Sequence, residues 1–582
     1  MDRFLSQLSF SHDESASYTV YAVWLGSLSI GLYLAYQWAL PKPIPGIPYN
    51  AEAVKTVFGD APSLVEHTSK TRELYSWMVK QNIKLQSPII QLFVRPLSKP
   101  WVVIADFQEA QDILIRRTKE FDKSIWFKDV AGAVMPESHI FMRTTPRFKQ
   151  HRRIIQDIMT PGFLNNVAAL HIHNVAKDVI RLWEQKARVT KSHPFAVIQD
   201  VHYGALDAIW SIIFGEDSSN NTTRTQLKLY STINSVDLPS NKESEVDLPR
   251  AESPVTVQSV MTLTQSIDAS LKSPVPALAH WVYRQGSDMK KAFKTKEEFI
   301  QKEVERSRQR FEEQAGKSEV RCAVDNILRR EAIFAEKEGR KVDFHSRDVY
   351  DEVLGLLIAA HDTTSTSILW ALKFLADNQE VQTKLRAALR TAHMGAVAEK
   401  RYPTFQEIVN TTSHYRDAVV EEIFRVSLTE AAVCRTSLVD TEILGHFVPK
   451  DTEVFFMCNG PSIFSSPFVI DESTRSPTYV KGSTCNWDPA HMAAFDPDRW
   501  LVDRDGQKVF EPSAGPLLVF SLGERGCYGR KMAYLEMRLF LTMLVWAFDF
   551  QECPKGLSGY GAIDKLVHAP QQCYIKPVKL AL

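Results

Sequence analysis

The sequence has few cysteines and no pair of them at C-x-x-C spacing. Seven cysteines occur among 582 residues, all in the C-terminal half. Their odd number and scattered positions argue against a disulfide framework and against a zinc ribbon. We therefore expect a reducing compartment, in which most of these cysteines are small buried side chains.

Net charge is also absent, because 69 lysines and arginines balance 69 aspartates and glutamates. A neutral chain gives no reason to expect nucleic acid as a partner. The G-x-G-x-x-G fingerprint of flavin- and nicotinamide-binding folds is missing too. If the protein is a redox enzyme, its electrons must come from a separate protein.

One N-terminal stretch lacks charge altogether. Residues Tyr18 to Leu40 contain no acid and no base, and as a helix they would span ~34 Å, enough to cross a bilayer core. The preceding leader is acidic and the apolar run is long, which argues against a cleaved signal peptide. We expect a single transmembrane signal-anchor helix at 18–40, after a tail at 1–17. Lys42 follows it and favours a cytosolic C-terminal domain.

The rest of the chain reads as mostly α with small β-sheets. A proline-rich hinge at 41–50 is followed by one domain, 51–582, without internal repeats. Ile89 to Phe107 alternates β-formers and predicts a hairpin, whereas the chain up to Leu428 is largely helical in period. Asp217 to Pro254 is rich in Ser, Asn, Thr and Pro, and predicts a long polar loop. Short strands after Thr436 and a helix at Met532 to Phe548 complete the expectation.

The stretch FSLGERGCYGR, near the C-terminus, carries the clearest chemistry. A thiolate needs positive potential nearby, and the start of the following helix supplies it to Cys527. Gly526 and Gly529 leave room for a flat ligand close to the backbone. Arg525 could pair with an anionic group on that ligand, and Phe520 would shield the sulfur from water. These requirements fit a single axial thiolate on a haem iron.

The same stretch resembles the cytochrome P450 signature F-x-x-G-x-R-x-C-x-G. Every fixed position of that signature is matched, by Phe520, Gly523, Arg525, Cys527 and Gly529. The resemblance covers nearly the whole chain from about Pro41 onward, and its motifs follow one another in the family's order. It implies a cytochrome P450 fold behind the transmembrane helix, with residues 51–582 as the haem-thiolate catalytic domain.

Two further segments are similar to the family's E-x-x-R and F-x-P-x-R-[FW] motifs. In VVEEIFRVS, Glu422 and Arg425 stand one helical turn apart, and FDPDRW supplies Arg499. The resemblance implies a buried triad that locks the core around the haem. On spacing alone, a surface ion pair would explain Glu422 and Arg425 equally well.

An acid and alcohols occupy the middle of the apolar stretch LLIAAHDTTSTSILWAL. We expect a long buried helix there, capped at Ser346. Polar groups inside such a helix are costly unless they are used, although hydrogen bonding of Thr to its own helix is an alternative. The segment is similar to the family's [AG]-G-x-[DE]-T-[TS], with Ala360 in place of the usual glycine. The implied catalytic roles are a hydrogen bond from Thr363 to bound oxygen and proton relay through Asp362.

A weaker similarity concerns the haem propionates. RFKQHRRI resembles the family's W-x-x-x-R helix, with Phe148 where tryptophan is usual and Arg152 four residues on. Arg435 occupies another place where the family often has a propionate-binding arginine. Both could equally be solvated surface charges.

The resemblance implies a microsomal-type monooxygenase that uses haem b and O₂ to hydroxylate, epoxidise or otherwise oxidise a lipophilic small molecule. The implied electron donor is NADPH-cytochrome P450 reductase, with cytochrome b5 as a second candidate, and Arg152, Arg153, Arg530 and Lys531 are candidate docking residues. The implied location is the endoplasmic reticulum membrane, with the domain in the cytosol. The long insertions suggest specialised metabolite biosynthesis.

Three other functions remain open at this point, one of which is a membrane-tethered structural protein without a cofactor, although that function leaves the cysteine loop unexplained. A protein of the same fold could rearrange or dehydrate an oxygenated substrate without O₂, although such members tend to lose the acid–alcohol pair that Asp362 and Thr363 provide here. A non-catalytic haem-binding sensor would not need those residues. The sequence does not identify the substrate.

Overall fold

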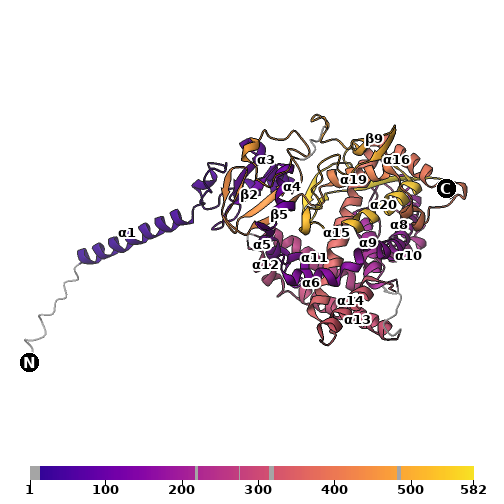
Figure 1. Ribbon diagram of the computed structural model, residues 1–582, viewed down its shortest axis with the longest axis horizontal. Coiled ribbons are helices and arrows are strands. Elements are labelled where there is room, and N and C mark those ends of the chain that lie inside the picture. Colours follow the sequence, from indigo (N-terminus) through magenta and orange to yellow (C-terminus); the bar gives the residue numbers. More distant parts are fainter. Residues whose placement is uncertain (1–13, 217–219, 274, 314–319, 482–486) are drawn as a thin grey trace, which may run out of the picture.

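The computed structural model describes residues 14–216, 220–273, 275–313, 320–481 and 487–582. The expected N-terminal tail therefore lies largely outside the described residues. Helices dominate the architecture, and their order along the chain agrees with a mostly α fold (Figure 1). The helices are α1 (Glu14–Ala39), α2 (Ala61–Thr71), α3 (Tyr75–Leu85), α4 (Phe107–Arg116), α5 (Ile125–Ala131), α6 (Pro146–Ile154), α7 (Pro161–Phe163), α8 (Ala169–Thr190), α9 (Ile198–Phe214), α10 (Thr222–Thr232), α11 (Val255–Leu271), α12 (Pro276–Tyr283), α13 (Ser287–Glu313), α14 (Ala323–Glu338), α15 (Arg347–Asp377), α16 (Gln379–Ala392), α17 (Met394–Ala398), α18 (Phe405–Asn410), α19 (His414–Ser427) and α20 (Arg530–Ala547).

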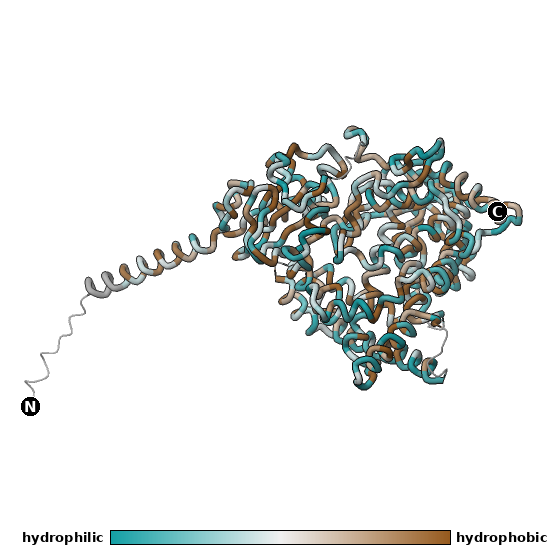
Figure 2. The backbone as a smooth tube through the Cα atoms, viewed as in Figure 1, coloured by the Kyte–Doolittle hydropathy of each residue, from teal (hydrophilic) through white to brown (hydrophobic). Residues whose placement is uncertain are grey.

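Helix α1 projects away from the body of the molecule (Figure 1). Its large apolar side chains are exposed, from Tyr21 to Trp38, and apolar residues are spread along its length (Figure 2). The Tyr36 hydroxyl donates to the Lys55 carbonyl at 2.9 Å, where the helix meets the body. Among the described residues, no helix combines the length and the hydropathy needed to cross a membrane.

The proline-rich stretch after α1 is fixed to the first strand. The Gln91 side chain accepts from the Ile44 N–H and donates to the carbonyls of Ile44 and Ile47, each at 2.8 Å. Ile44 and Ile47 are themselves buried. The middle of this segment is therefore held against β1 rather than left as a free linker.

Five strands form the main sheet, in the order β1-β2-β8-β5-β3. Only β2 and β8 run parallel, and the β1–β2 hairpin confirms the hairpin predicted within Ile89 to Phe107. Strand β5 carries Arg435 and lies between β8 and β3, so the β5–β3 end of this sheet supplies one wall of the site described below. The strands are β1 (Ile89–Leu92), β2 (Trp101–Ile104), β3 (Phe121–Lys123), β4 (Phe195–Ala196), β5 (Ala432–Ser437), β6 (Thr441–Ile443), β7 (His446–Val448), β8 (Glu453–Met457), β9 (Leu501–Arg504), β10 (Gln507–Phe510), β11 (Phe548–Gln551), β12 (Ala562–Asp564), β13 (His568–Pro570) and β14 (Tyr574–Lys579).

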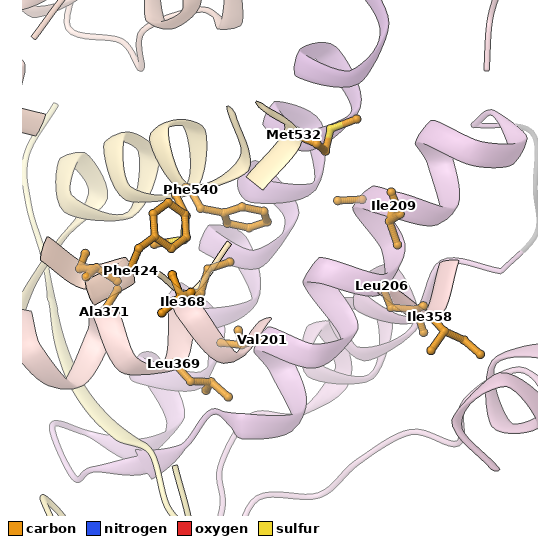
Figure 3. Packing of buried hydrophobic residues seen from close by; sticks show 14 of the residues in the cluster. Val201, Leu206, Ile209, Ile358, Ile368, Leu369, Ala371, Phe424, Met532 and Phe540 are labelled. Carbon is orange, nitrogen blue, oxygen red and sulfur yellow. The ribbon is translucent and has the colours of Figure 1, made fainter. Parts of the chain in front are cut away.

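The long helix α15 is the centre of the core. It begins where the sequence predicts, because the Ser346 hydroxyl caps it by accepting from the Val349 N–H at 3.3 Å. Figure 3 shows apolar side chains of α9 and α20 gathered around it. Packing of three such helices excludes water, so any polar group within α15 must find a partner or a ligand.

One loop expectation is wrong in part. Within Asp217 to Pro254, helix α10 forms at Thr222–Thr232. The Asn221 side chain caps it by accepting from the Arg224 N–H at 2.8 Å, and the buried Asp207 carboxylate accepts from the N–H groups of Thr222 and Thr223. The remote carboxylate of Asp207 stabilises a helix start that the local composition did not reveal.

Candidate functional site

The cysteine loop connects the main body to α20. The Cys527 N–H donates to the Phe520 carbonyl at 2.7 Å, which closes the loop upon itself. Gly523 has φ +69°, and a Cβ there would lie 2.2 Å from the Leu114 carbonyl oxygen of α4, so only glycine fits. Gly529 caps α20, and a Cβ on it would lie 3.9 Å from the Cys527 sulfur, an ordinary contact. Gly523 is therefore required by packing, whereas Gly529 keeps the surroundings of the sulfur open.

Cys527 opens into a cavity of about 330 Å³. Its walls come from α6, α9, α15, β5 and α20, and they are mainly apolar. Phe520 lies beside the loop and packs edge-on against Phe424 of α19, with ring centres 4.8 Å apart. Apolar residues contributed to the walls include Ile209, Ile212, Ile213, Leu356, Val433 and Val519. The sulfur is thus exposed to a mainly apolar cavity suited to a lipophilic ligand.

The thiol of Cys527 is not stabilised as an anion by the protein alone. Burial raises its pKa, and the Gly529 N–H, Arg530 and Arg152 offset this only in part. The N–H group of Gly529 at the start of α20 lowers the pKa of Cys527, as expected, but burial raises this pKa by more. A thiolate at this position therefore needs a cationic partner at the sulfur itself, and a bound iron meets that need.

Four basic side chains gather at one side of the cavity: Lys123, Arg152, Arg435 and Arg525. Within the described part of the chain none of them forms an ion pair with a carboxylate at contact distance. Arg435 donates to the Cys434 carbonyl and to the Ser521 hydroxyl, each at 2.8 Å, and burial lowers its pKa. Burial likewise lowers the pKa of Arg525 to about 10 and lowers that of Lys123.

This excess of buried positive charge is costly unless an anion is bound. One terminal nitrogen of Arg525, Nη1, is buried and has no hydrogen-bond partner among the described residues. Haem carries two propionates on one edge of a flat apolar ring, with iron at its centre. The unmatched cations, the apolar walls and the thiol of Cys527 fit that group. Sequence reasoning missed Lys123, because its place in the site follows from the pairing of β3 with β5.

Phe148 stands where tryptophan is usual, and it has a clear packing role. It is buried, with the Arg525 guanidinium 3.9 Å and the Arg152 guanidinium 5.6 Å from its ring centre. The Arg152 guanidinium also lies 4.2 Å from the ring centre of Tyr528. Two aromatic rings thus hold Arg152 at the cavity wall by cation–π contact.

The acid and the alcohol of α15 point in different directions. Thr363 lines the cavity, and its hydroxyl donates to the Ala359 carbonyl at 2.8 Å. Asp362 is not part of the cavity wall, and its carboxylate lies 3.7 Å from Nδ1 of His202 on α9. Burial lowers the pKa of His202 to about 4, so its imidazole is neutral near pH 7. The structure therefore places Thr363 at the cavity and Asp362 behind it.

Glu536 is a second buried acid that the sequence analysis missed. It belongs to α20, lines the cavity and accepts from the Thr364 hydroxyl at 2.7 Å. Burial raises its pKa to about 8, so that it holds a proton at neutral pH. Its position nine residues after the cysteine, within an apolar helix, was a usable signal, since a glutamate seldom occupies a buried helix face without a function.

Glu422, Arg425 and Arg499 come together as one buried ion cluster. Both oxygens of Glu422 accept from Arg425, at 2.6 and 2.8 Å, and Arg499 approaches Glu422 at 3.2 Å. The Trp500 indole and the Asp496 N–H also donate to Glu422, at 2.8 and 2.9 Å. The carboxylate is therefore fully satisfied, as a buried charge requires. None of the three residues lines the cavity, so their contribution is structural.

A larger hollow, of about 670 Å³, lies between α7, α9, α13 and α14. It is lined by Cys322, Arg310 and Glu216 among others, and it contains none of the predicted site residues. Burial raises the pKa of Cys322 to about 12, so its thiol is unreactive at neutral pH. The smaller cavity at Cys527 is therefore the candidate functional site, because it contains the predicted haem-binding residues.

Comparison with known proteins agrees with the interpretation of the Cys527 cavity as a haem site. The family model described as Cytochrome P450 matches residues 63–469 and 490–558. The chain is 35% identical to cytochrome P450 monooxygenase TRI13 of Fusarium sporotrichioides, over 95% of this chain and 98% of that protein. It is also 35% identical to cytochrome P450 monooxygenase GME11363 of Pestalotiopsis microspora and 33% identical to cytochrome P450 monooxygenase xilC of Penicillium crustosum. Each of these two alignments covers 98% of this chain, with 100% and 99% of the respective relative.

Proposed function

The chain belongs to the cytochrome P450 family and is a haem-thiolate monooxygenase, and on that premise we propose that it inserts one atom of O₂ into a lipophilic small molecule with electrons from NADPH-cytochrome P450 reductase. The observation that carries this proposal is the thiol of Cys527, in its glycine-flanked loop, at the wall of a mainly apolar cavity edged by cations without a carboxylate at contact distance. Cytochrome b5 is a second candidate donor. The prosthetic group we propose is haem b, because the sequence contains no C-x-x-C-H motif of the kind that attaches haem covalently.

When bound, the haem would supply O₂ binding and activation, with Cys527 as its thiolate ligand. Arg152, Arg435, Arg525 and Lys123 would bind its propionates, and Phe520 would exclude water from the sulfur. The apolar walls of the cavity would limit the access of water to the substrate, which favours oxygenation of the substrate over loss of electrons to solvent.

Protons must reach the cavity although its walls are apolar. We propose that the Thr363 hydroxyl holds a proton at the cavity face of α15 and that Asp362 replenishes it from the α9 side, next to neutral His202. Glu536 holds a proton within the same wall. An acid behind the wall and an alcohol in it can pass protons inward without admitting bulk water.

We further propose that α1 embeds the enzyme in the endoplasmic reticulum membrane, with the catalytic domain facing the cytosol. Support comes from the uncharged stretch at 18–40 and from its exposed apolar side chains, such as Trp24, which is 72% exposed. Cell fractionation of the full chain and of a chain lacking residues 1–40 tests this. Equal distribution of both in the soluble fraction would contradict it.

The pathway we propose is fungal specialised metabolism. The similar proteins named above come from fungi, and another relative, from Dothistroma septosporum, is named for an Hps1-dma1 cluster. The test uses microsomes containing this chain and the reductase, with NADPH, ¹⁸O₂ and an extract from a strain that lacks the gene. One labelled oxygen atom per product molecule is expected. A product that forms without NADPH, or without the label, would overturn the proposal.

A further inference from the structure

One carboxyl group in the cavity wall has no protein partner. Glu430 lies between α19 and β5 and lines the cavity at Cys527. Throughout the described ranges, no hydrogen bond or contact ion pair involves its carboxylate. Its side chain is half-buried and forms part of the cavity wall, so a ligand in the cavity can reach it. The group is available to a ligand.

The backbone places Glu430 there at some conformational cost. Leu428 ends α19 in the left-handed region, with φ +50° and ψ +35°, which is uncommon for a residue other than glycine. The next residue, Thr429, is fixed to α15, because its hydroxyl lies 2.9 Å from that of Ser367. Ser367 in turn donates to the Thr363 carbonyl at 3.1 Å. The bend at Leu428 thus places Glu430 on the cavity wall next to Thr363 of α15.

The surroundings of Glu430 indicate which ligands it can bind. Burial raises its pKa, whereas the nearby cations of Lys123 and Arg435 lower it. These cations oppose a positively charged ligand group beside the carboxyl, and the carboxyl opposes a negatively charged one. A neutral group that can donate or accept a hydrogen bond meets neither penalty.

We propose that the Glu430 carboxyl is the polar anchor of the substrate, which is a neutral lipophilic molecule with a hydroxyl or carbonyl oxygen. This inference rests on the proposed function, since it takes the cavity to be the substrate site. An apolar pocket discriminates weakly between skeletons of similar size. A buried hydrogen-bonding group rejects the analogue that lacks the matching oxygen, because the group would then remain unpaired. Glu430 therefore contributes to substrate choice and orientation.

The test uses rigid pairs of a hydrocarbon and its alcohol: adamantane with 1-adamantanol, and bornane with borneol. Dissociation constants are measured on the haem-loaded full chain from the shift of the haem absorption band, and independently from thermal stabilisation. The wild type should bind the alcohol about tenfold more tightly than the hydrocarbon. Glu430→Leu should bind both equally, and Glu430→Gln, which retains hydrogen bonding, should keep most of the preference.

A matched control is Glu421→Gln. Glu421 is a buried glutamate of α19 with a pKa raised to about 7 by burial, but it accepts from Tyr534 and does not line the cavity. This change should leave the alcohol preference intact. If Glu430 were merely a counterion for Lys123 and Arg435, both Glu430 variants would lose haem equally and the alcohol preference would persist in the residual holoprotein.

The proposal is overturned if no alcohol of the series binds the wild type, or if the preference survives in Glu430→Leu. Either result would leave intact the haem spectrum and the NADPH-dependent oxygen incorporation that test the proposed function. Conversely, loss of oxygen incorporation with a retained alcohol preference would contradict the proposed function alone. The two claims therefore fail separately.

Discussion

Arg425 forms a two-pronged ion pair with Glu422, one turn earlier on α19, and neither side chain is exposed to solvent. The Glu422 carboxylate also lies 3.2 Å from Arg499, which belongs to the short turn just before β9. Because this turn, β9 and β10 all pack against α19, the cluster holds the segment that leads to the cysteine loop. The geometry explains why three residues outside the cavity matter for the site.

Replacing Glu422 by Ala should unfold or strongly destabilise the domain. The change leaves the buried guanidinium of Arg425 without its carboxylate, which typically costs about 3–5 kcal/mol, and it also removes one carboxylate from beside Arg499. Chemical denaturation of the holoprotein measures the loss. Glu52→Ala is the matched control, because Glu52 pairs with Lys55 on the surface and both side chains are mostly exposed. Similar stabilities of the two variants would contradict the structural role of the triad.

Arg435→Leu should lower the fraction of purified protein that carries haem, whereas Arg435→Lys should retain more of it. The reason is the loss of one buried cation from the set that we assign to the propionates. The ratio of haem absorbance to protein absorbance is the measurement. Arg153→Leu is the control, since Arg153 is exposed and does not line the cavity. Equal haem content in all four proteins would remove Arg435 from the haem site.

The exposed basic residues Arg153 and Lys531 should influence electron delivery. Reversing both charges, to Glu, should slow reduction by the reductase about tenfold at low salt and less at high salt, because exposed charges are screened. Stopped-flow reduction under carbon monoxide gives the rate. An unchanged rate at low salt would show that the reductase docks elsewhere.

Thr363→Ala should uncouple electron use from oxygenation. NADPH consumption should continue while product per NADPH falls several-fold, because the hydroxyl at the cavity face no longer holds a proton there. Thr366→Ala is a matched control on the same helix, since the Thr366 hydroxyl is buried and does not line the cavity. Unchanged coupling in Thr363→Ala would count against the relay.

Stability should fall at alkaline pH through one buried histidine. Burial lowers the pKa of His151, but hydrogen bonds to Asp348 and Glu352 of α15 outweigh it and raise the pKa to about 9. His139 also contacts Glu352. A folded-state pKa above the unfolded value of 6.5 means that this stabilisation is complete below about pH 6.5 and is lost as pH rises through about 9.

Thermal melting from pH 6 to pH 10 tests this, with His151→Gln as the comparison. The difference in melting temperature between the wild type and the variant should shrink as the pH rises. A difference that is constant over this range would contradict the assignment of the raised pKa to His151.

Local signals predicted much of the fold. The Ser346 cap, the apolar run of α15 and the β1–β2 hairpin depend on neighbours in sequence, and they form where the sequence predicts. Helix α10 was missed, because its start is completed by Asp207, which belongs to the preceding helix. Contacts that join distant segments leave no periodic trace in the sequence.

The residues of the site also fall into two groups: those that a contiguous motif predicts and those that only tertiary contacts bring to the cavity. Cys527 and the residues of its motif are recognisable because the loop is contiguous. Lys123, Glu430 and Glu536 reach the cavity only through the pairing of β3 with β5, the bend at Leu428 and the packing of α20 on α15. Asp362 and Thr363 were recognised together in one motif, but their separate directions follow from the helix: successive helical residues face about 100° apart, and Asp362 lies toward His202.

The most direct test of the central claim is the absorption difference spectrum of the reduced protein with carbon monoxide. The wild type should show the strongly red-shifted Soret band of thiolate-ligated haem, and Cys527→Ala should lose it. Cys434→Ala should keep it, since Cys434 lines the same cavity but burial raises its thiol pKa to about 11. A red-shifted band that persists in Cys527→Ala, or that is absent from haem-loaded wild type, would contradict the assignment of Cys527 as the haem thiolate.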